Sequence, residues 1–319
     1  MNILITGASG FIGYHLSRKL SDNKKNKVFL TDNHFRGRND KNFKNLIKKN
    51  NVKYFKADLS EKKEFKKFPK KIDLVFHLAA INGTDNFYKI PEKVLIKNTL
   101  ININLFEHIK DKKIKIIYAS SSEVYASTTS LLKNKIPSDE KIEISIDDIS
   151  NVRYSYAISK IFGESLLFSL NKNFKIPFTI IRFHNIYGPR MGDNHVMPEL
   201  INRIQNSKSK LDLYGSINTR SFCYIDDAVN ALIFMTKKIQ NQIVHIGNDS
   251  EEIKIIDLSK KILKLMNKNL VINKKSAPEG SVLRRLPNIT KLKSLGYKPS
   301  VSLDHGLKET IKWYVENKK

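Results

Sequence analysis

Residues 1–13 read MNILITGASGFIG, and this stretch decides the fold. Residues 2–6 form an apolar run of strand length, three glycines follow at intervals of three, and helical spacing of apolar residues begins at Phe11. A strand that passes through a glycine-rich turn into a helix opens a parallel βαβ unit. The N–H groups and the positive dipole end of such a helix suit a pyrophosphate. The stretch therefore predicts a dinucleotide site at the start of an α/β fold.

Apolar runs of strand length alternate with amphipathic segments, such as residues 11–20 and 94–109, over the first part of the chain. This alternation predicts an α/β fold with a doubly wound parallel sheet (Rossmann) over residues 1–184, to which residues 228–246 return. The rhythm becomes irregular beyond residue 185, which predicts a smaller C-terminal substrate-binding lobe over residues 185–319. The expected strands are residues 2–6, 27–31, 52–56, 74–77, 115–119 and 178–183.

The composition is that of a basic globular protein, with 57 Lys and Arg, 31 Asp and Glu and a formal net charge of +26. The lysines are scattered through every segment and form no basic stripe with interleaved aromatic residues, so we expect no nucleic-acid partner. No apolar run approaches the roughly 18–20 residues that span a bilayer, and we expect no membrane partner. A single cysteine favours a reducing compartment, so a cytoplasmic location is expected.

Acidic and small residues follow the second, third and fourth expected strands, where ligands of parallel sheets bind. Asp32 lies nineteen residues after Gly13, a position from which a carboxylate bonds the adenosine ribose and repels a 2′-phosphate. This favours NAD over NADP as the cofactor, although Arg36 and Arg38 could receive a 2′-phosphate. The predicted cofactor-binding residues are Gly7, Gly10, Phe11, Ile12, Gly13, Asp32, Asn33, Asp58, Leu59, Leu78, Ala79, Ala80, Tyr156 and Lys160.

The fifth strand leads into Ser121 and Glu123, and Tyr156 and Lys160 follow four residues apart, so that the latter two share one face of a helix. A phenol is a poor base at neutral pH, with a reference pKa of ~10. We expect the Lys160 ammonium and a positive nicotinamide to lower the pKa of Tyr156. Tyr156 then takes the proton of a substrate hydroxyl while hydride leaves for NAD, Ser121 holds the same oxygen, and Lys160 also binds the nicotinamide ribose.

The motifs together resemble the extended short-chain dehydrogenases/reductases, the NAD-dependent epimerase/dehydratase group that acts on nucleotide sugars. The resemblance covers nearly the whole chain and implies a homodimer formed by helices such as residues 94–109 and the Tyr156 helix. The matching pieces are Gly7-x-x-Gly10-x-x-Gly13, Asp32-Asn33 with Gly37, Asp58-Leu59, residues 77–80, Asn98 with Asn104, residues 120–125, Tyr156 with Lys160, and residues 182–190.

The same resemblance implies a substrate site in the C-terminal lobe. Asn185 would contact the substrate diphosphate, and Val196 and the two residues after it would line the nucleotide pocket. Arg220 looks like the family's phosphate arginine, and Arg284 or Arg285 looks like its second basic contact. Scarce arginines in this part of the chain, Arg182 and Arg190 included, fit a phosphate-binding region. No metal ligand set is expected.

Oxidation at the sugar C4 is the step that such enzymes share, and epimerisation, 4,6-dehydration or decarboxylation follows. The pair Ser122-Glu123 resembles that of the sugar-nucleotide decarboxylases and of the GDP-mannose type of dehydratase. Ser122 is accordingly expected to bind substrate, whereas Glu123 could be a base, a ligand of a substrate hydroxyl or a structural residue. Two alternatives stay open: a C4 dehydrogenase that releases a stable 4-keto product, and a dinucleotide-sensing protein without turnover.

Overall fold

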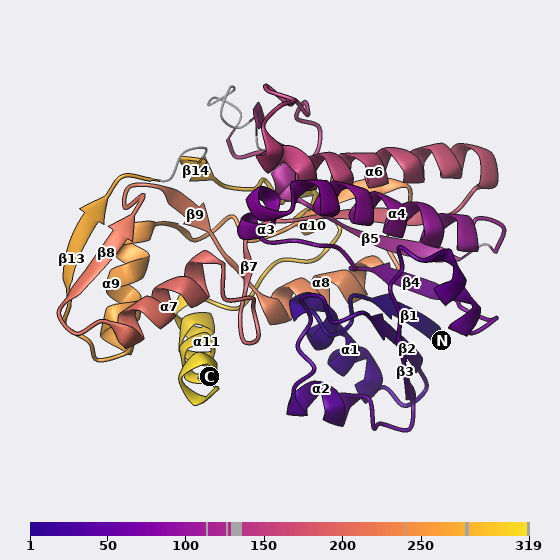
Figure 1. Ribbon diagram of the computed structural model, residues 1–319, viewed down its shortest axis with the longest axis horizontal. Helices are drawn as coiled ribbons and strands as arrows, with labels where there is room; N and C mark the ends of the chain where they lie inside the picture. Colours follow the sequence, from indigo (N-terminus) through magenta and orange to yellow (C-terminus); the bar gives the residue numbers. More distant parts are fainter. Residues whose placement is uncertain (113, 126, 129–135, 239, 278–280, 318–319) are drawn as a thin grey trace. The chain divides into compact units, whose positions relative to one another are not determined.

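The computed structural model describes residues 1–112, 114–125, 127–128, 136–238, 240–277 and 281–317 (Figure 1). The chain divides into two compact units. The first comprises Met1–Val124, Asp148–Arg182 and Leu232–Val244, and the second comprises Tyr125–Asp147, Phe183–Ala231 and His245–Lys319. The segment Tyr125–Asp147 thus clusters with the second unit, whereas the sequence analysis places it in the sheet domain.

A seven-stranded parallel sheet forms the centre of the first unit. The strands are β1 (Asn2–Thr6), β2 (Lys27–Asp32), β3 (Val52–Lys56), β4 (Leu74–His77), β5 (Lys115–Ser121), β6 (Phe178–Phe183) and β11 (Gln242–Ile246). Their order across the sheet is β11-β6-β5-β4-β1-β2-β3, so the chain winds outward from β1 in both directions. The predicted doubly wound parallel sheet is confirmed. Its first six strands lie where they were expected, with β2 one and β5 two residues longer.

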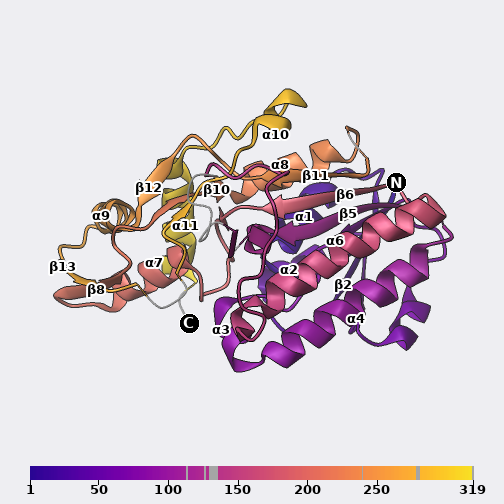
Figure 2. The ribbon, with the colours of Figure 1, turned by 90° about the horizontal axis from the view of Figure 1, so that it is seen from above.

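Helices cover both faces of this sheet. The helices are α1 (Phe11–Asp22), α2 (Lys41–Leu46), α3 (Thr84–Lys89), α4 (Pro91–Ile109) and α6 (Ser155–Phe174), with short 3₁₀ turns η1 (Lys62–Lys67), η2 (Ser122–Tyr125) and η4 (Val152–Tyr154). Figure 2 shows α4 and α6 running side by side on one face, while α1 packs on β1 and β2. Pro91 starts α4 at a position where its missing N–H costs nothing.

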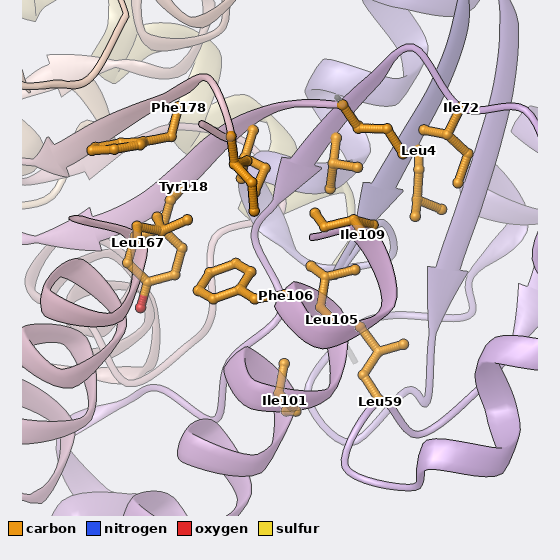
Figure 3. Packing of buried hydrophobic residues seen from close by; sticks show 14 of the residues in the cluster. Leu4, Leu59, Ile72, Ile101, Leu105, Phe106, Ile109, Tyr118, Leu167 and Phe178 are labelled. Carbon is orange, nitrogen blue, oxygen red and sulfur yellow. The ribbon is translucent and has the colours of Figure 1, made fainter. Parts of the chain in front are cut away.

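The core between the sheet and the α4–α6 layer is apolar and closely packed (Figure 3). Phe106 of α4 and Leu167 of α6 lie next to Tyr118 of β5, Leu105 of α4 belongs to the same cluster, and all are buried. Because strands of a parallel sheet are covered on both faces, they consist of near-continuous apolar runs rather than alternating ones. This packing holds the carboxyl ends of β1, β4 and β5 in fixed relation, which positions the residues that follow them.

The described residues of the second unit form three small sheets, of order β10-β7, β12-β9-β14 and β13-β8, together with a group of helices. In this group α7, α9 and α11 pack on one another. Helix α8 (Ile225–Met235) passes from the second unit into the first. The elements are β7 (Ile186–Tyr187), α7 (Val196–Asn206), β8 (Lys210–Tyr214), β9 (Thr219–Ser221), β10 (Cys223–Tyr224), β12 (Glu252–Lys254), α9 (Ile255–Leu265), β13 (Val271–Lys275), β14 (Arg284–Arg285), α10 (Thr290–Ser294) and α11 (Leu303–Glu316).

None of the helices in the described part of the chain has the length and apolar character needed to cross a lipid bilayer.

Candidate active site

The glycine-rich turn lies between β1 and α1 and is packed against the end of β4. Gly7 has a φ of 68°, and a Cβ placed on it would come within 2.9 Å of the backbone of Leu78 and Ala79. Thr6 Oγ1 accepts hydrogen bonds from both of those backbone N–H groups at 3.1 Å. The N-cap of α1 is Gly10, which makes no side-chain cap. The turn therefore offers a small-residue cradle and a helix N-terminus to a phosphate, which fits a dinucleotide.

Asp32 ends β2 beside this turn. Its Oδ2 accepts a hydrogen bond from the Ser9 N–H at 3.0 Å, and its Oδ1 accepts one from the His34 N–H at 2.7 Å. An ionised carboxylate has about four acceptor sites, so both oxygens can still accept from ribose hydroxyls. The guanidinium of Arg36 packs against Gly83, and its charge acts on Tyr156.

Asp58 follows β3 and has neighbours of its own. Burial raises the pKa of Asp58, but hydrogen bonds from Ser60 and the charge of Lys97 outweigh it and bring the pKa below its ordinary value. Lys97 Nζ lies 3.7 Å from Asp58 Oδ2. Asp58 is therefore an ionised acceptor at the same edge of the sheet as Asp32.

Tyr156 lies in the first turn of α6 and is 6% exposed. Its ring stacks on that of Phe87 from α3, with centroids 5.0 Å apart and an interplanar angle of 11°. Ser121, at the end of β5, forms a side-chain hydrogen bond with the phenol. The structure thus brings Ser121 and Tyr156 together, and it adds Phe87, which the sequence analysis missed because no motif marks it.

The pKa of Tyr156 departs from the expectation. Burial, followed by the charge of Glu123, raises it above its ordinary value, while Arg36 and the Ser121 hydrogen bond lower it by less. Burial therefore outweighs the groups of the chain that lower this pKa, and the expected lowering by the nicotinamide stays a prediction. The physical reason is that the enclosed ring loses the hydration that would stabilise a phenolate.

Lys160 lies one turn further along α6 and is 3% exposed. Its Nζ donates to the Ala119 carbonyl at 2.8 Å and lies 5.5 Å from the centre of the Tyr156 ring. Burial lowers the pKa of Lys160 to about 7, and the charge of Glu164 opposes this shift. Lys160 is consequently divided between its charged and neutral forms near neutral pH.

Glu164, one turn after Lys160 on α6, belongs to a buried ion pair. Glu164 and Arg182 are 5% and 2% exposed at their side chains, and Arg182 makes two hydrogen bonds to Glu164, at 2.9 and 2.5 Å. Ser120 donates to the same carboxylate at 2.5 Å. Arg182 is thus enclosed in the first unit, and its expected place in a phosphate region is wrong. The i, i+4 spacing from Lys160 to Glu164 places that carboxylate on the Lys160 face of α6, but no spacing in the sequence marks Arg182 as its partner.

Glu123 lies in η2 and pairs with Arg153 at 3.2 Å. Both side chains are more than four-fifths buried, and the Glu123 N–H donates to Ser121 Oγ at 3.2 Å. Ser122, between them in sequence, is buried. The charge of Glu123 therefore acts on the Tyr156 phenol, and its backbone N–H is hydrogen-bonded to Ser121.

The residues expected to bind substrate, apart from Ser122, belong to the second unit. Arg220 donates to three backbone carbonyls, those of Thr219, Val282 and Leu283. Arg284 makes a two-pronged ion pair with Glu252, at 2.8 Å for each bond. The parallel pairing of β14 with β9 sets Arg285 opposite Arg220. The remaining two are Asn185, whose side chain donates to the Ser221 carbonyl, and Val196, the exposed first residue of α7.

The described residues contain no group of three or more His, Cys, Asp and Glu side chains that could hold a metal ion.

Comparisons with known proteins decide the family. The model of the NAD dependent epimerase/dehydratase family matches residues 3–247. The chain belongs to this family. The resemblance stated from the motifs is confirmed, and with it the prediction of NAD as cofactor.

Relatives of the family share most of the chain's length. A UDP-N-acetyl-alpha-D-glucosaminuronate decarboxylase of Bacillus cytotoxicus is 32% identical over 98% of this chain and 97% of its own. A dTDP-D-glucose 4,6-dehydratase of Dictyostelium discoideum is 32% identical over 99% of this chain and 82% of its own. A crystal structure of the UDP-glucuronic acid 4-epimerase of Bacillus cereus with NAD has a TM-score of 0.84 and a sequence identity of 28%. The comparison covers 100% of both chains. The prediction of an NAD-dependent enzyme of this kind is confirmed.

Proposed function

We propose that the chain oxidises a nucleotide-activated sugar at C4 with NAD, and then completes an epimerisation, a 4,6-dehydration or a decarboxylation. The observation that carries the proposal is the enclosed phenol of Tyr156, hydrogen-bonded to Ser121 and one helical turn from Lys160. The activities named for the relatives support it, because all three reactions occur among them.

The chain's own groups divide the proton chemistry among them. Bound NAD would supply the acceptor for the hydride of C4 and a positive charge that favours the phenolate of Tyr156. Ser121 holds the hydroxyl at C4, and Tyr156 in its phenolate form takes the proton of that hydroxyl. Lys160, with a pKa of about 7, donates to the Ala119 carbonyl and binds the ribose of the dinucleotide. The Phe87 ring holds the phenol in place and keeps water from it.

Glu123 is placed to act after the oxidation. Its carboxylate is held by Arg153 and its N–H by Ser121, so it is fixed next to the hydroxyl that holds the reacting oxygen. A carboxylate in that place could act as the base of an elimination, as a ligand of a sugar hydroxyl or as a structural partner of Arg153.

The second unit supports a choice between the two candidate arginines. Arg284 is committed to Glu252, and its pKa is raised by that hydrogen bond. Arg285 lies opposite Arg220 in the ladder, and opposite residues of paired strands project to the same side. We therefore assign the substrate phosphates to Arg220 and Arg285 and not to Arg284.

We also propose a homodimer and a cytoplasmic location. An apolar stripe on α4 and α6 supports the dimer, because Ile96, Leu100 and Phe162 are exposed by 56%, 37% and 36% on helices that lie side by side (Figure 2). We expect light scattering to give the mass of two chains, and Leu100→Glu to give that of one, whereas the control Leu283→Glu, at an exposed leucine of the second unit, leaves the mass unchanged. An unaltered mass in Leu100→Glu would remove this stripe from the interface.

The buried single cysteine fits a reducing compartment, which supports the proposed cytoplasmic location.

The function is tested by incubating the protein with NAD and a panel of nucleotide sugars that includes neutral sugars and uronates, and by identifying products by mass and NMR. Conversion of a panel member to its 4-epimer, 4-keto-6-deoxy product or decarboxylated product is expected. Accumulation of a 4-keto sugar with one NADH per product would assign a C4 dehydrogenase instead. Glu123→Gln in the same panel separates its roles, because a purely structural residue leaves the product profile unchanged.

Asp32 is expected to set the preference for NAD. Asp32→Ala removes a charged acceptor of the ribose, so we expect NAD to bind about tenfold more weakly or worse. Binding of NADP falls less, because the repulsion of its 2′-phosphate is removed together with the acceptor. The ratio of the two dissociation constants, measured by calorimetry, is the readout. Asp32→Asn is the milder variant, which loses the charge and keeps one acceptor oxygen for the contacts with Ser9 and His34. An unchanged ratio in both variants would mean that Asp32 does not face the ribose.

A further inference from the structure

His34 holds a strained backbone at the edge of the proposed cofactor site. It lies two residues beyond β2 with a φ of 61°, in the left-handed region that is uncommon for residues other than Gly and that Asn, Asp and His adopt more often than the rest. Its N–H donates to Asp32 Oδ1 at 2.7 Å. A strained residue of this kind persists where its surroundings over-determine it.

Both nitrogens of the His34 ring are hydrogen-bonded. Nδ1 lies 3.0 Å from Ser9 Oγ, and Nε2 lies 2.7 Å from the hydroxyl of Tyr54. Tyr54 donates its proton to the Asp32 carbonyl at 3.1 Å. Burial and the charge of Asp32 raise the pKa of Tyr54 to about 12, so the proton stays in place at neutral pH. A neutral His34 ring protonated on Nε2 matches all of these contacts: Ser9 donates to Nδ1, Nε2 donates to Tyr54, and Tyr54 donates to the Asp32 carbonyl.

The ring is also fixed by packing. Phe43 of α2 is fully buried and meets His34 edge to face at 5.7 Å and 85°. It meets Tyr54 in the same way at 5.3 Å and 89°. Edge-to-face pairs at these separations are favourable beyond the area that they bury. His34 therefore has little rotational freedom.

Ser9, the other end of the chain of hydrogen bonds, belongs to the glycine-rich turn. Its N–H donates to Asp32 Oδ2 at 3.0 Å, and its carbonyl accepts from the Arg38 N–H at 3.1 Å. A Cβ on Gly37 would overlap the Ser9 side chain, so the residue at 37 must be small for the two segments to meet. The turn is thus tied to the segment after β2 through its backbone and through its side chain.

We propose that His34 is a positioning residue that clamps the phosphate-binding turn at Ser9 to the ribose-binding acid Asp32, through the closed circuit of Ser9, His34, Tyr54 and Asp32. The clamp aligns the two recognition elements before the dinucleotide arrives, and so reduces the ordering that binding requires. It acts on affinity for the dinucleotide. The inference rests on the proposed function in one respect, that the ligand is NAD.

The test measures the dissociation constant of NAD by calorimetry in two single variants and in their combination. Tyr54→Phe removes one oxygen of the circuit, and we expect NAD to bind about three- to tenfold more weakly. His34→Asn keeps a residue that tolerates the left-handed backbone but loses the ring, and the same weakening is expected. In the His34→Asn background, Tyr54→Phe should add less than about a twofold change, because both act through one ring.

Asn51→Ala is the matched control for stability. Asn51 lies at the other end of β3 and donates to the Ser21 and Asn26 carbonyls at 2.9 and 3.2 Å. It should lower the melting temperature and leave the dissociation constant of NAD unchanged. Equal weakening by Asn51→Ala and Tyr54→Phe, or a Tyr54→Phe effect that persists in full in the His34→Asn background, would overturn the clamp. If the unaltered protein bound no NAD, the proposed function would fall as well, and the two failures are therefore distinguishable.

Discussion

Tyr156→Phe is expected to lower kcat by about 10²–10⁴-fold, because it removes the one atom that takes the proton of the C4 hydroxyl. The ring stays, so its stacking on Phe87 and the fold of α6 are retained. NAD binding should change little, since Lys160 and the glycine-rich turn are untouched. The effect should therefore appear in kcat at saturating NAD and substrate, measured in single-turnover experiments.

Tyr154→Phe is the matched control for this prediction. Tyr154 lies two residues earlier and is buried too, but it belongs to η4 and has Ile158, not a lysine, four residues on. Deleting the same atom there should leave kcat within a few fold. Equal losses in the two variants would mean that the phenol of Tyr156 takes no proton in the reaction.

Glu164→Gln is expected to destabilise the protein by about 3–5 kcal/mol, because it leaves the enclosed guanidinium of Arg182 without its counter-charge. Urea unfolding measures the loss. Glu199→Gln is the control, since it breaks an exposed pair with Arg203 at 3.2 Å and should cost about 0.5 kcal/mol or less. Similar midpoints for the two variants would show that the buried pair contributes no more than a surface pair.

The same variant has a second readout in the pH profile. Burial lowers the pKa of Lys160 to about 7, and the charge of Glu164 opposes this lowering. Removing the carboxylate must move this pKa further down, so the limb of the activity profile that reports deprotonation of Lys160 shifts to lower pH. A destabilised variant with an unmoved limb would make Glu164 a stability residue without influence on Lys160.

Much of the first unit could be predicted because its signals are local. The apolar runs that became β1, β4 and β6 are buried along almost their whole length, as expected for strands covered on both faces. The proximity of Ser121 to Tyr156 followed from two local facts, a strand end and a helix start, which a parallel sheet brings to one edge.

Other parts of the site could not be predicted because they depend on contacts between segments far apart in sequence. The Phe87 ring stacks on Tyr156, which lies 69 positions away, and nothing in the sequence of α3 predicts this contact. Arg182 looked like a phosphate ligand while its carboxylate partner was unknown. The direction of the Tyr156 pKa depended on how completely the ring is enclosed, which the identities of its sequence neighbours do not state.

The sequence by itself determined the order of strands and helices, the glycine-rich turn and the residues that end each strand, because periodicity and turn chemistry act over a few residues. Only the tertiary structure decided which charges are shared. In the folded chain Glu164 pairs with Arg182, Glu252 pairs with Arg284, and Asp32 accepts hydrogen bonds from Ser9 and His34. The strength of such interactions depends on burial and on distance in space.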